Sequence, residues 1–164
     1  MNIRQSLMNE ILDQFKISKT GVHGPSHWAR VKHHGMVIGE RVGADLEIVN
    51  LFAFLHDSQR ENEYSDPDHG LRAAKYAKQL NHVFFELRDI QMTLLIKALE
   101  GHSKVGVHTN STIQTCWDAD RLDLGRVGIK PAPEFLSKEG QKWIDFAYEW
   151  SVTGKVPSHP EVNS

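Results

Sequence analysis

The sequence predicts an all-α fold. Apolar residues recur three and four positions apart along most of the chain, which is the period of an amphipathic helix. Glycines, prolines and helix-capping residues separate these segments. No stretch of about four to eight residues alternates apolar and polar side chains between turn signals, as a half-buried strand would. At 164 residues the chain has the length of one domain, so we expect a single domain over residues 1–164.

The first two expected helices are separated by a Gly/Pro break. Residues 1–16 form the first, because four apolar side chains fall four positions apart on one stripe: Ile3, Leu7, Ile11 and Phe15. Residues 21–25 contain two glycines and a proline and interrupt the pattern. Ser26 is then expected to be the N-cap of a second helix that runs to about Gly43.

The next two helices have recognisable caps. Asp45 can cap a helix whose centre, residues 48–55, is apolar on nearly all sides, which predicts a buried helix. Residues 66–68, Asp-Pro-Asp, place a capping residue before a proline at the first helical position. We expect a helix from this point to about Leu80.

Two further helices follow the same periodicity. Apolar residues keep the helical period from Leu87 until Gly101 interrupts it. Residues 111–114 have the form of a capping box and open a helix that ends near Gly125.

The last helix is expected over about 134–151, after two prolines at 131 and 133. It carries Trp143, Phe146 and Trp150 on one side. The tail, residues 154–164, has little to bury and is expected to be extended. The whole chain therefore predicts about six to seven main helices.

Composition excludes several classes of protein. The 19 Lys and Arg nearly cancel the 21 Asp and Glu, so the chain lacks the basic excess that binds duplex nucleic acid. One cysteine excludes an internal disulfide framework. The longest apolar run, residues 51–55, is too short for a membrane span, and the N-terminal segment lacks the apolar run of a signal peptide. We expect a soluble cytoplasmic protein that binds neither duplex nucleic acid nor membrane.

The dipeptide His56-Asp57 ends the most apolar stretch of the chain. Both side chains are therefore expected at the edge of the core. An unpaired carboxylate buried there would destabilise the fold by several kcal/mol. Asp57 therefore needs a hydrogen-bond partner or a cation. A simple His–Asp hydrogen bond that closes the helix is the alternative to a metal site.

Two other polar residues fall on apolar or capped helix faces. Asp120 lies on the stripe of Ile113, Trp117 and Leu124, whereas Asp118 points away from it. His27 lies in the first turn of its helix, where a surface position is the alternative. Together with His56-Asp57 these residues give two imidazoles and two carboxylates from three helices, a set that suits Mn, Fe, Co, Ni, Zn or Mg.

In the order His27, His56-Asp57, Asp120, the chain resembles the HD-domain superfamily of metal-dependent phosphohydrolases, whose pattern is H…HD…D on an all-α fold. The matching stretches are GPSHWARV at 24–31, FLHD at 54–57 and ADRL at 119–122, which frame a motif-bearing core of about 20–126. The resemblance implies a compact helical bundle of the HD type and a divalent metal ion held by these four residues.

Two more histidines resemble the extra ligands of members that bind two metals. His69 follows the HD doublet ahead of a small residue, and His102 follows a helix end. Each is a candidate for a second metal or a substrate contact. The alternatives are a surface residue for His69 and, for His102, a helix C-cap stabilised by the helix dipole. The Gly-Tyr-Pro element of the cyclic-dinucleotide branch is absent.

The resemblance implies hydrolysis of a phosphomonoester or phosphoanhydride on a small molecule, with a nucleotide as the expected substrate. Arg30, Arg60 and Arg121 are the candidates for binding phosphate, because a planar guanidinium suits its oxygens. Asp57 could bridge two metals or orient water, while Glu61 or Asp118 could accept a proton. Two alternatives are a di-iron oxygenase of the same type and a non-catalytic nucleotide-binding module.

Overall fold

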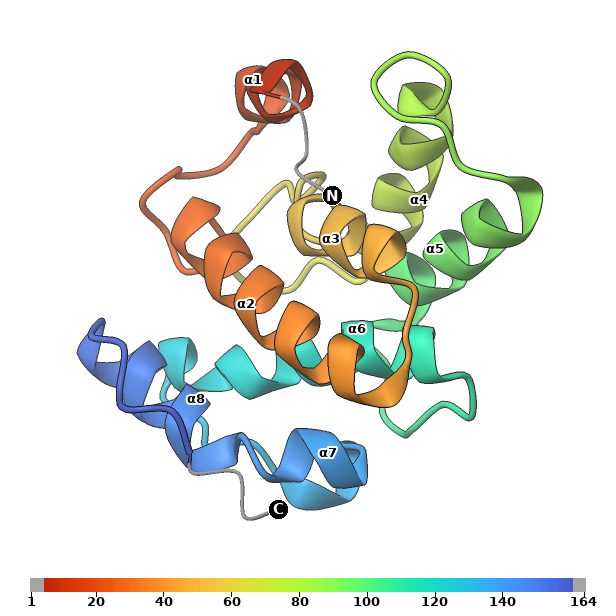
Figure 1. The fold of residues 1–164 in the computed structure, drawn as a ribbon. Helices are drawn as coiled ribbons and strands as arrows, with labels where there is room; N and C mark the ends of the chain where they lie inside the picture. Colours follow the sequence, from red (N-terminus) through yellow and green to blue (C-terminus); the bar gives the residue numbers. More distant parts are fainter. Residues whose placement is uncertain (1–4, 161–164) are drawn as a thin grey trace.

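The computed structural model describes residues 5–160, and within them it is all helical (Figure 1). Eight α-helices occur in these residues: α1 Gln5–Gln14, α2 Pro25–Val42, α3 Leu46–Leu55, α4 His69–Leu80, α5 Asp89–Gly101, α6 Ser111–Leu122, α7 Lys138–Gln141 and α8 Ile144–Thr153. Two 3₁₀ segments, η1 Asp123–Val127 and η2 Pro133–Phe135, follow α6. The predicted fold class is confirmed. Ile3 of the first expected stripe lies outside the described residues.

Helix α3 forms the centre of the fold and packs against α1, α2, α5 and α6. Its buried apolar residues confirm the expectation of an interior helix: Ile48, Val49, Leu51, Phe52, Ala53 and Leu55. The Asp45 carboxylate caps it by accepting the N–H groups of Glu47 and Ile48. The His56-Asp57 doublet follows the last turn of this helix, so the core fixes its position.

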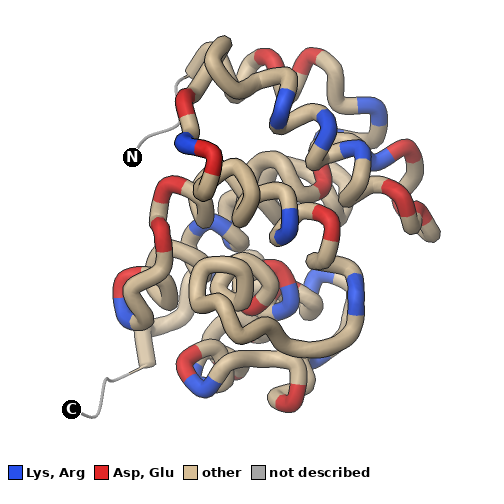
Figure 2. Tube along the Cα trace, turned by 90° about the vertical axis from the view of Figure 1, so that its right-hand side faces the viewer, with Lys and Arg blue, Asp and Glu red and all other residues tan. Residues whose placement is uncertain are grey.

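A second, smaller apolar cluster holds the C-terminal helices against α2 and α6. Its buried members are Ile38, Leu122, Leu136, Trp143, Phe146 and Ala147. In Figure 1 helices α7 and α8 lie on the side of α6 away from α3. Basic and acidic positions are interspersed along the chain in Figure 2, and neither sign forms a continuous stretch there. None of the described helices is long and apolar enough to cross a membrane.

Three predicted helix starts are displaced by one or two residues. The N-cap of α2 is Gly24 rather than Ser26, and Pro25 occupies the first turn. A Cβ at residue 24 would lie 2.6 Å from the Lys19 carbonyl oxygen, so this close backbone approach requires glycine. Helix α4 begins at His69 instead of 67, and Asn110, not Ser111, caps α6 by accepting the Ile113 N–H.

The last helix, expected over about 134–151, is instead divided into η2, α7 and α8. The Asp118 carboxylate accepts the Ser137 N–H at 3.0 Å and also the Ser137 hydroxyl, which bends the chain toward α6 at this point. The Ser137 hydroxyl in turn accepts the Gly140 N–H and caps α7. In the expected tail, residues 155–160 form no helix or strand, and 161–164 lie outside the described residues.

We predict that Gly70→Ala lowers the free energy of unfolding by about 1–3 kcal/mol, because a Cβ at residue 70 would lie 2.4 Å from the Leu99 carbonyl oxygen of α5. Helix propensity alone favours alanine by up to about 1 kcal/mol, so the sign of the change is decisive. Denaturant unfolding measures it, with Lys75→Ala at an exposed position of α4 as the control. A more stable Gly70→Ala variant would contradict this packing.

Candidate metal centre

Three helical elements bring the four sequence-predicted residues together. His27 comes from α2, His56 and Asp57 follow α3, and Asp120 lies in α6. The Nε2 atoms of His27 and His56 are 2.9 Å apart. Asp57 Oδ2 lies 3.5 and 3.6 Å from these two nitrogens, and Asp120 Oδ1 lies 3.3 and 3.7 Å from them. The simple His–Asp hydrogen bond is therefore not the arrangement that the structure contains.

The other oxygen of Asp57 faces a second pair of imidazoles. His69, at the start of α4, and His102, just after α5, have Nε2 atoms 2.8 Å apart. Asp57 Oδ1 lies 3.4 Å from the first and 3.9 Å from the second. Both histidines are buried, which corrects the surface alternative for His69. One carboxylate thus lies between two pairs of histidines.

Hydrogen bonds on the far side of each ring fix its tautomer. His27 Nδ1 donates to Asp123 Oδ2 at 2.6 Å, and His56 Nδ1 donates to the carbonyls of residues 52 and 53. His69 Nδ1 donates to the Asp66 carbonyl and His102 Nδ1 to the Leu99 carbonyl. Because carbonyl and carboxylate oxygens only accept, each Nδ1 carries a proton. In the neutral rings all four Nε2 lone pairs therefore face inward.

This donor set fits a metal ion. Two lone pairs less than 3 Å apart repel each other unless a proton or a cation lies between them. Nitrogen and oxygen ligands at about 2.0–2.2 Å from one ion lie about 3 Å from each other, close to the spacing seen here. Each of two groups, His27-His56-Asp57 and Asp57-His69-His102, has its donor atoms within 4.8 Å of one another and can hold a metal ion.

The pKa values of His27, His56 and Asp120 are strongly perturbed. Burial and the Arg126 charge oppose protonation of His27, but hydrogen bonds to Asp120, Asp123 and Asp57 outweigh them and raise its pKa to about 9. Burial lowers the pKa of His56 to about 3, so this ring is neutral. Burial acts against ionisation of Asp120, yet the neighbouring imidazoles and Arg126 hold its pKa below its usual value. Without a metal, a proton on His27 balances part of the carboxylate charge.

Sequence reasoning missed Asp123, a fully buried carboxylate in η1. It accepts from His27 Nδ1 and also from Arg30, whose Nε and Nη2 lie 2.6 and 3.0 Å from its oxygens. Arg30, which we expected to bind phosphate, is thus bonded on two nitrogens to the group that orients His27. Asp123 follows Asp120 by three positions, about one helical turn, which was the signal available in the sequence.

Two further polar groups lie beside the cluster: Arg126, which carried no signal in the sequence, and His23, whose position close to the His27 motif was its only signal. Arg126 Nη2 lies 3.8 Å from Asp120 Oδ1, and the same guanidinium donates to the carbonyls of Val22 and Asp123. His23 is buried, with Nδ1 2.7 Å from Glu63 Oε2, and its ring lies edge-on 6.5 Å from that of His27.

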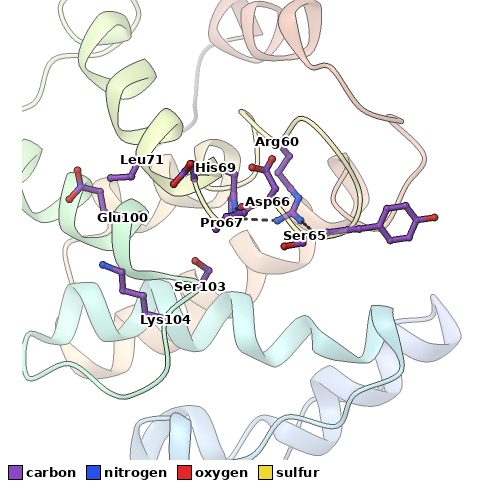
Figure 3. Close-up of a pocket in the computed structure, with 11 residues that line it drawn as sticks. Arg60, Ser65, Asp66, Pro67, His69, Leu71, Glu100, Ser103 and Lys104 are labelled. Atoms are coloured by element: carbon purple, nitrogen blue, oxygen red, sulfur yellow. Dashed lines mark hydrogen bonds between the residues drawn. The ribbon is translucent and has the colours of Figure 1, made fainter.

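The other two expected phosphate-binding arginines have different environments. Arg60 Nη1 lies 3.6 Å from Asp57 Oδ1 and 3.5 Å from His69 Nε2, beside the cluster (Figure 3). Arg121 instead donates to three backbone carbonyls, those of Lys104, Gly106 and Phe135. Its guanidinium lies over the Trp117 ring at 5.2 Å. Arg121 therefore joins two loops and is not free to bind phosphate as we expected.

The two expected proton acceptors do not face the cluster. Glu61 is exposed and pairs with Lys16 Nζ at 2.9 Å. Asp118 is buried, but its carboxylate accepts from Gln114 and Ser137 on another side of α6. It is two residues before Asp120 and hence about 200° away around the helix. Both expectations are corrected by these contacts.

Two cavities adjoin the cluster. The larger, about 590 Å³, is lined by His69, Arg60 and Lys104 among other polar residues (Figure 3). The smaller, about 270 Å³, is lined by His102 and Asp120, by three further polar residues and by four apolar ones. Residues 103 and 104 line both cavities. His69 therefore borders the larger cavity, whereas His102, from the same donor group, and Asp120 border the smaller one.

Comparisons with known proteins identify one solved relative. No protein-family model and no curated protein matches the chain. The crystal structure of a predicted HD superfamily hydrolase from an uncultured Thermotogales bacterium is similar, with 27% sequence identity and a TM-score of 0.69. The match covers 90% of this chain and 86% of that one.

We predict that Asp123→Asn weakens binding of Mn²⁺ or Co²⁺ by about 10–100-fold, because His27 loses the carboxylate that orients it. Isothermal titration calorimetry measures the affinity. Asp118→Asn is the matched control: it also removes a buried carboxylate charge near α6, but one that bonds to Ser137, so metal affinity should be unchanged. Equal losses in both variants would contradict a role of Asp123 in the site.

Metal binding is also expected to depend on pH well above the usual titration of histidine. A metal ion must displace the proton of His27, so its apparent affinity should rise by about tenfold per pH unit between pH 7 and pH 9 and then level off. Asp120 contributes no proton in this range, because its pKa is lowered. Affinity measured at several pH values tests this, and a plateau already reached at pH 7 would refute it.

Proposed function

Because this chain has the HD-domain fold, we propose that it is a metal-dependent hydrolase of a phosphomonoester or phosphoanhydride on a small molecule. The observation that carries this proposal is the position of Asp57, a buried carboxylate with an inward-facing imidazole pair on each side. Four Nε2 donors and ionised carboxylates suit a divalent transition metal better than a purely structural ion pair.

His27, His56, Asp57 and Asp120 would hold one ion, and Asp57, His69 and His102 a second. A divalent ion held there would polarise a phosphoryl oxygen and make an attacking water more acidic. The protein's own contribution is orientation: Asp123 and the four backbone carbonyl acceptors fix the rings before any ion binds. This preorganisation lowers the entropy that the site must lose on loading.

Arg60 is the group that we propose to bind the phosphate. It is buried, and its Nη1 lies beside the cluster, while Nη2 and Nε donate to the carbonyls of Tyr64 and Asn62. These two bonds hold the guanidinium in place at the wall of the larger cavity. Two ionised aspartates would neutralise one divalent ion, so a phosphate needs this additional positive charge.

We predict metal-dependent release of phosphate when the protein is tested against a panel of phosphomonoesters and nucleotides with Mn²⁺, Co²⁺, Mg²⁺ and Zn²⁺. His56→Asn should lower the rate by more than about 100-fold, because it removes a donor from the centre of the site. His82→Asn is the matched control, since His82 is exposed and asparagine tolerates its positive φ. Full activity of His56→Asn would refute the site.

The six-donor set also favours one competitor, the di-iron oxygenase anticipated from the sequence resemblance. Purification without oxygen followed by iron analysis distinguishes the two functions. Two irons per chain together with oxygen consumption would favour the oxygenase. Phosphate release with Mn²⁺ or Co²⁺ in iron-free protein would favour the hydrolase. Tight nucleotide binding without turnover under every metal would favour the non-catalytic module.

A further inference from the structure

The smaller cavity beside the cluster differs in chemistry from the larger one. Its apolar lining consists of Val105, Leu124, Ala132 and Phe135. Its charged and polar lining comprises the two metal-site residues His102 and Asp120 together with Ser103, Lys104 and Arg121. The larger cavity is lined instead by Arg60, Asp66, Asp68 and Glu100, among others (Figure 3).

Arg121 is the residue that holds the smaller cavity together. Its Nη1 donates to the carbonyls of Gly106 and Phe135, both at 2.6 Å, and its Nη2 donates to the Lys104 carbonyl at 2.8 Å. The loop after α5 and the segment before α7 both contribute to the lining, and this one guanidinium joins them. With both Nη1 hydrogens engaged by carbonyls, Arg121 serves as a link between walls.

Size and position indicate what the smaller cavity would accept. A cavity of about 150 Å³ is enough for benzene, so about 270 Å³ can hold an aromatic ring or a short branched alkyl group. Asp120 and His102 belong both to its lining and to the cluster, so a molecule with its phosphate at the cluster can extend its organic group into this space. The four apolar residues of the lining favour an uncharged group there, and the Arg121 guanidinium in the same lining is already engaged by three carbonyls.

We propose that the substrate is a phosphate ester of an uncharged, largely apolar alcohol, that its organic group occupies the smaller cavity, and that Arg121 is a positioning residue which holds the walls of that cavity. This inference rests on the proposed hydrolase function and adds the class of leaving group. Specificity arises from Leu124 and Phe135, whereas Arg60 binds the phosphate common to all esters.

The test compares two esters with similar leaving alcohols, 2-phenylethyl phosphate and ethyl phosphate, in the metal-loaded full-length protein. We expect kcat/KM to favour the phenylethyl ester by about 10–100-fold. Leu124→Asn should reduce this ratio by at least about fivefold. Leu71→Asn, the same change in the lining of the larger cavity, should leave the ratio within about twofold of the wild-type value. A wild-type ratio near one, or equal effects of the two variants, would overturn the proposal.

The role of Arg121 is tested by comparing how its substitution changes KM for each of the two esters. Arg121→Gln should raise KM for the phenylethyl ester about tenfold more than KM for the ethyl ester, and Arg121→Lys, which cannot reach three carbonyls, should not restore it. An equal rise in KM for both esters would show that Arg121 binds the phosphate instead. Circular dichroism of each variant verifies that the helical fold is intact.

Failure of the proposed function can be separated from failure of this inference. If neither ester is hydrolysed, calorimetric binding of 3-phenylpropylphosphonate and propylphosphonate to the metal-loaded protein still tests the smaller cavity. The inference would be supported without hydrolysis if the phenyl compound binds more tightly than propylphosphonate and if Leu124→Asn abolishes this difference in affinity. Equal affinity for the two phosphonates would overturn it.

Discussion

The buried Asp57 carboxylate is the constraint on which the rest of the site depends. It follows the most apolar helix of the chain, where a lone negative charge would cost several kcal/mol. Its two oxygens face two pairs of imidazoles, and each ring is held by an acceptor on its outer side. The structure therefore concentrates metal-ligating donors in one place, with Arg60 Nη1 3.6 Å from Asp57 Oδ1 and Arg126 Nη2 3.8 Å from Asp120 Oδ1.

The fold supplies this arrangement through packing. Helix α3 lies within the core and carries the doublet, while α2, α4, α5 and α6 each bring one further donor to it. Close contacts between helices set the spacing: Gly70 lies against the Leu99 carbonyl, which is also the acceptor for His102. Rigid helix ends position metal ligands more accurately than loops would.

Much of the fold and three of the four principal donors could be predicted from local patterns in the sequence, whereas His27 was implied by the resemblance to HD domains. Asp120 interrupts an apolar helix stripe, and His56-Asp57 ends a buried run, so each is anomalous within its own helix. The partners of Arg30 and Arg121 could not be predicted. Each arginine lies on a helix face that suits either solvent or a ligand, and only the tertiary fold brings it to Asp123 or to the carbonyls of distant loops.

The most direct test of the account is the position of a bound metal. Crystals grown with Mn²⁺ or Co²⁺ and measured at the absorption edge should give an anomalous peak between Asp57 Oδ2, Asp120 and the Nε2 atoms of His27 and His56. A second peak between Asp57 Oδ1, His69 and His102 would identify a two-metal centre. Anomalous peaks only at surface residues, with the four imidazoles unchanged, would contradict the account.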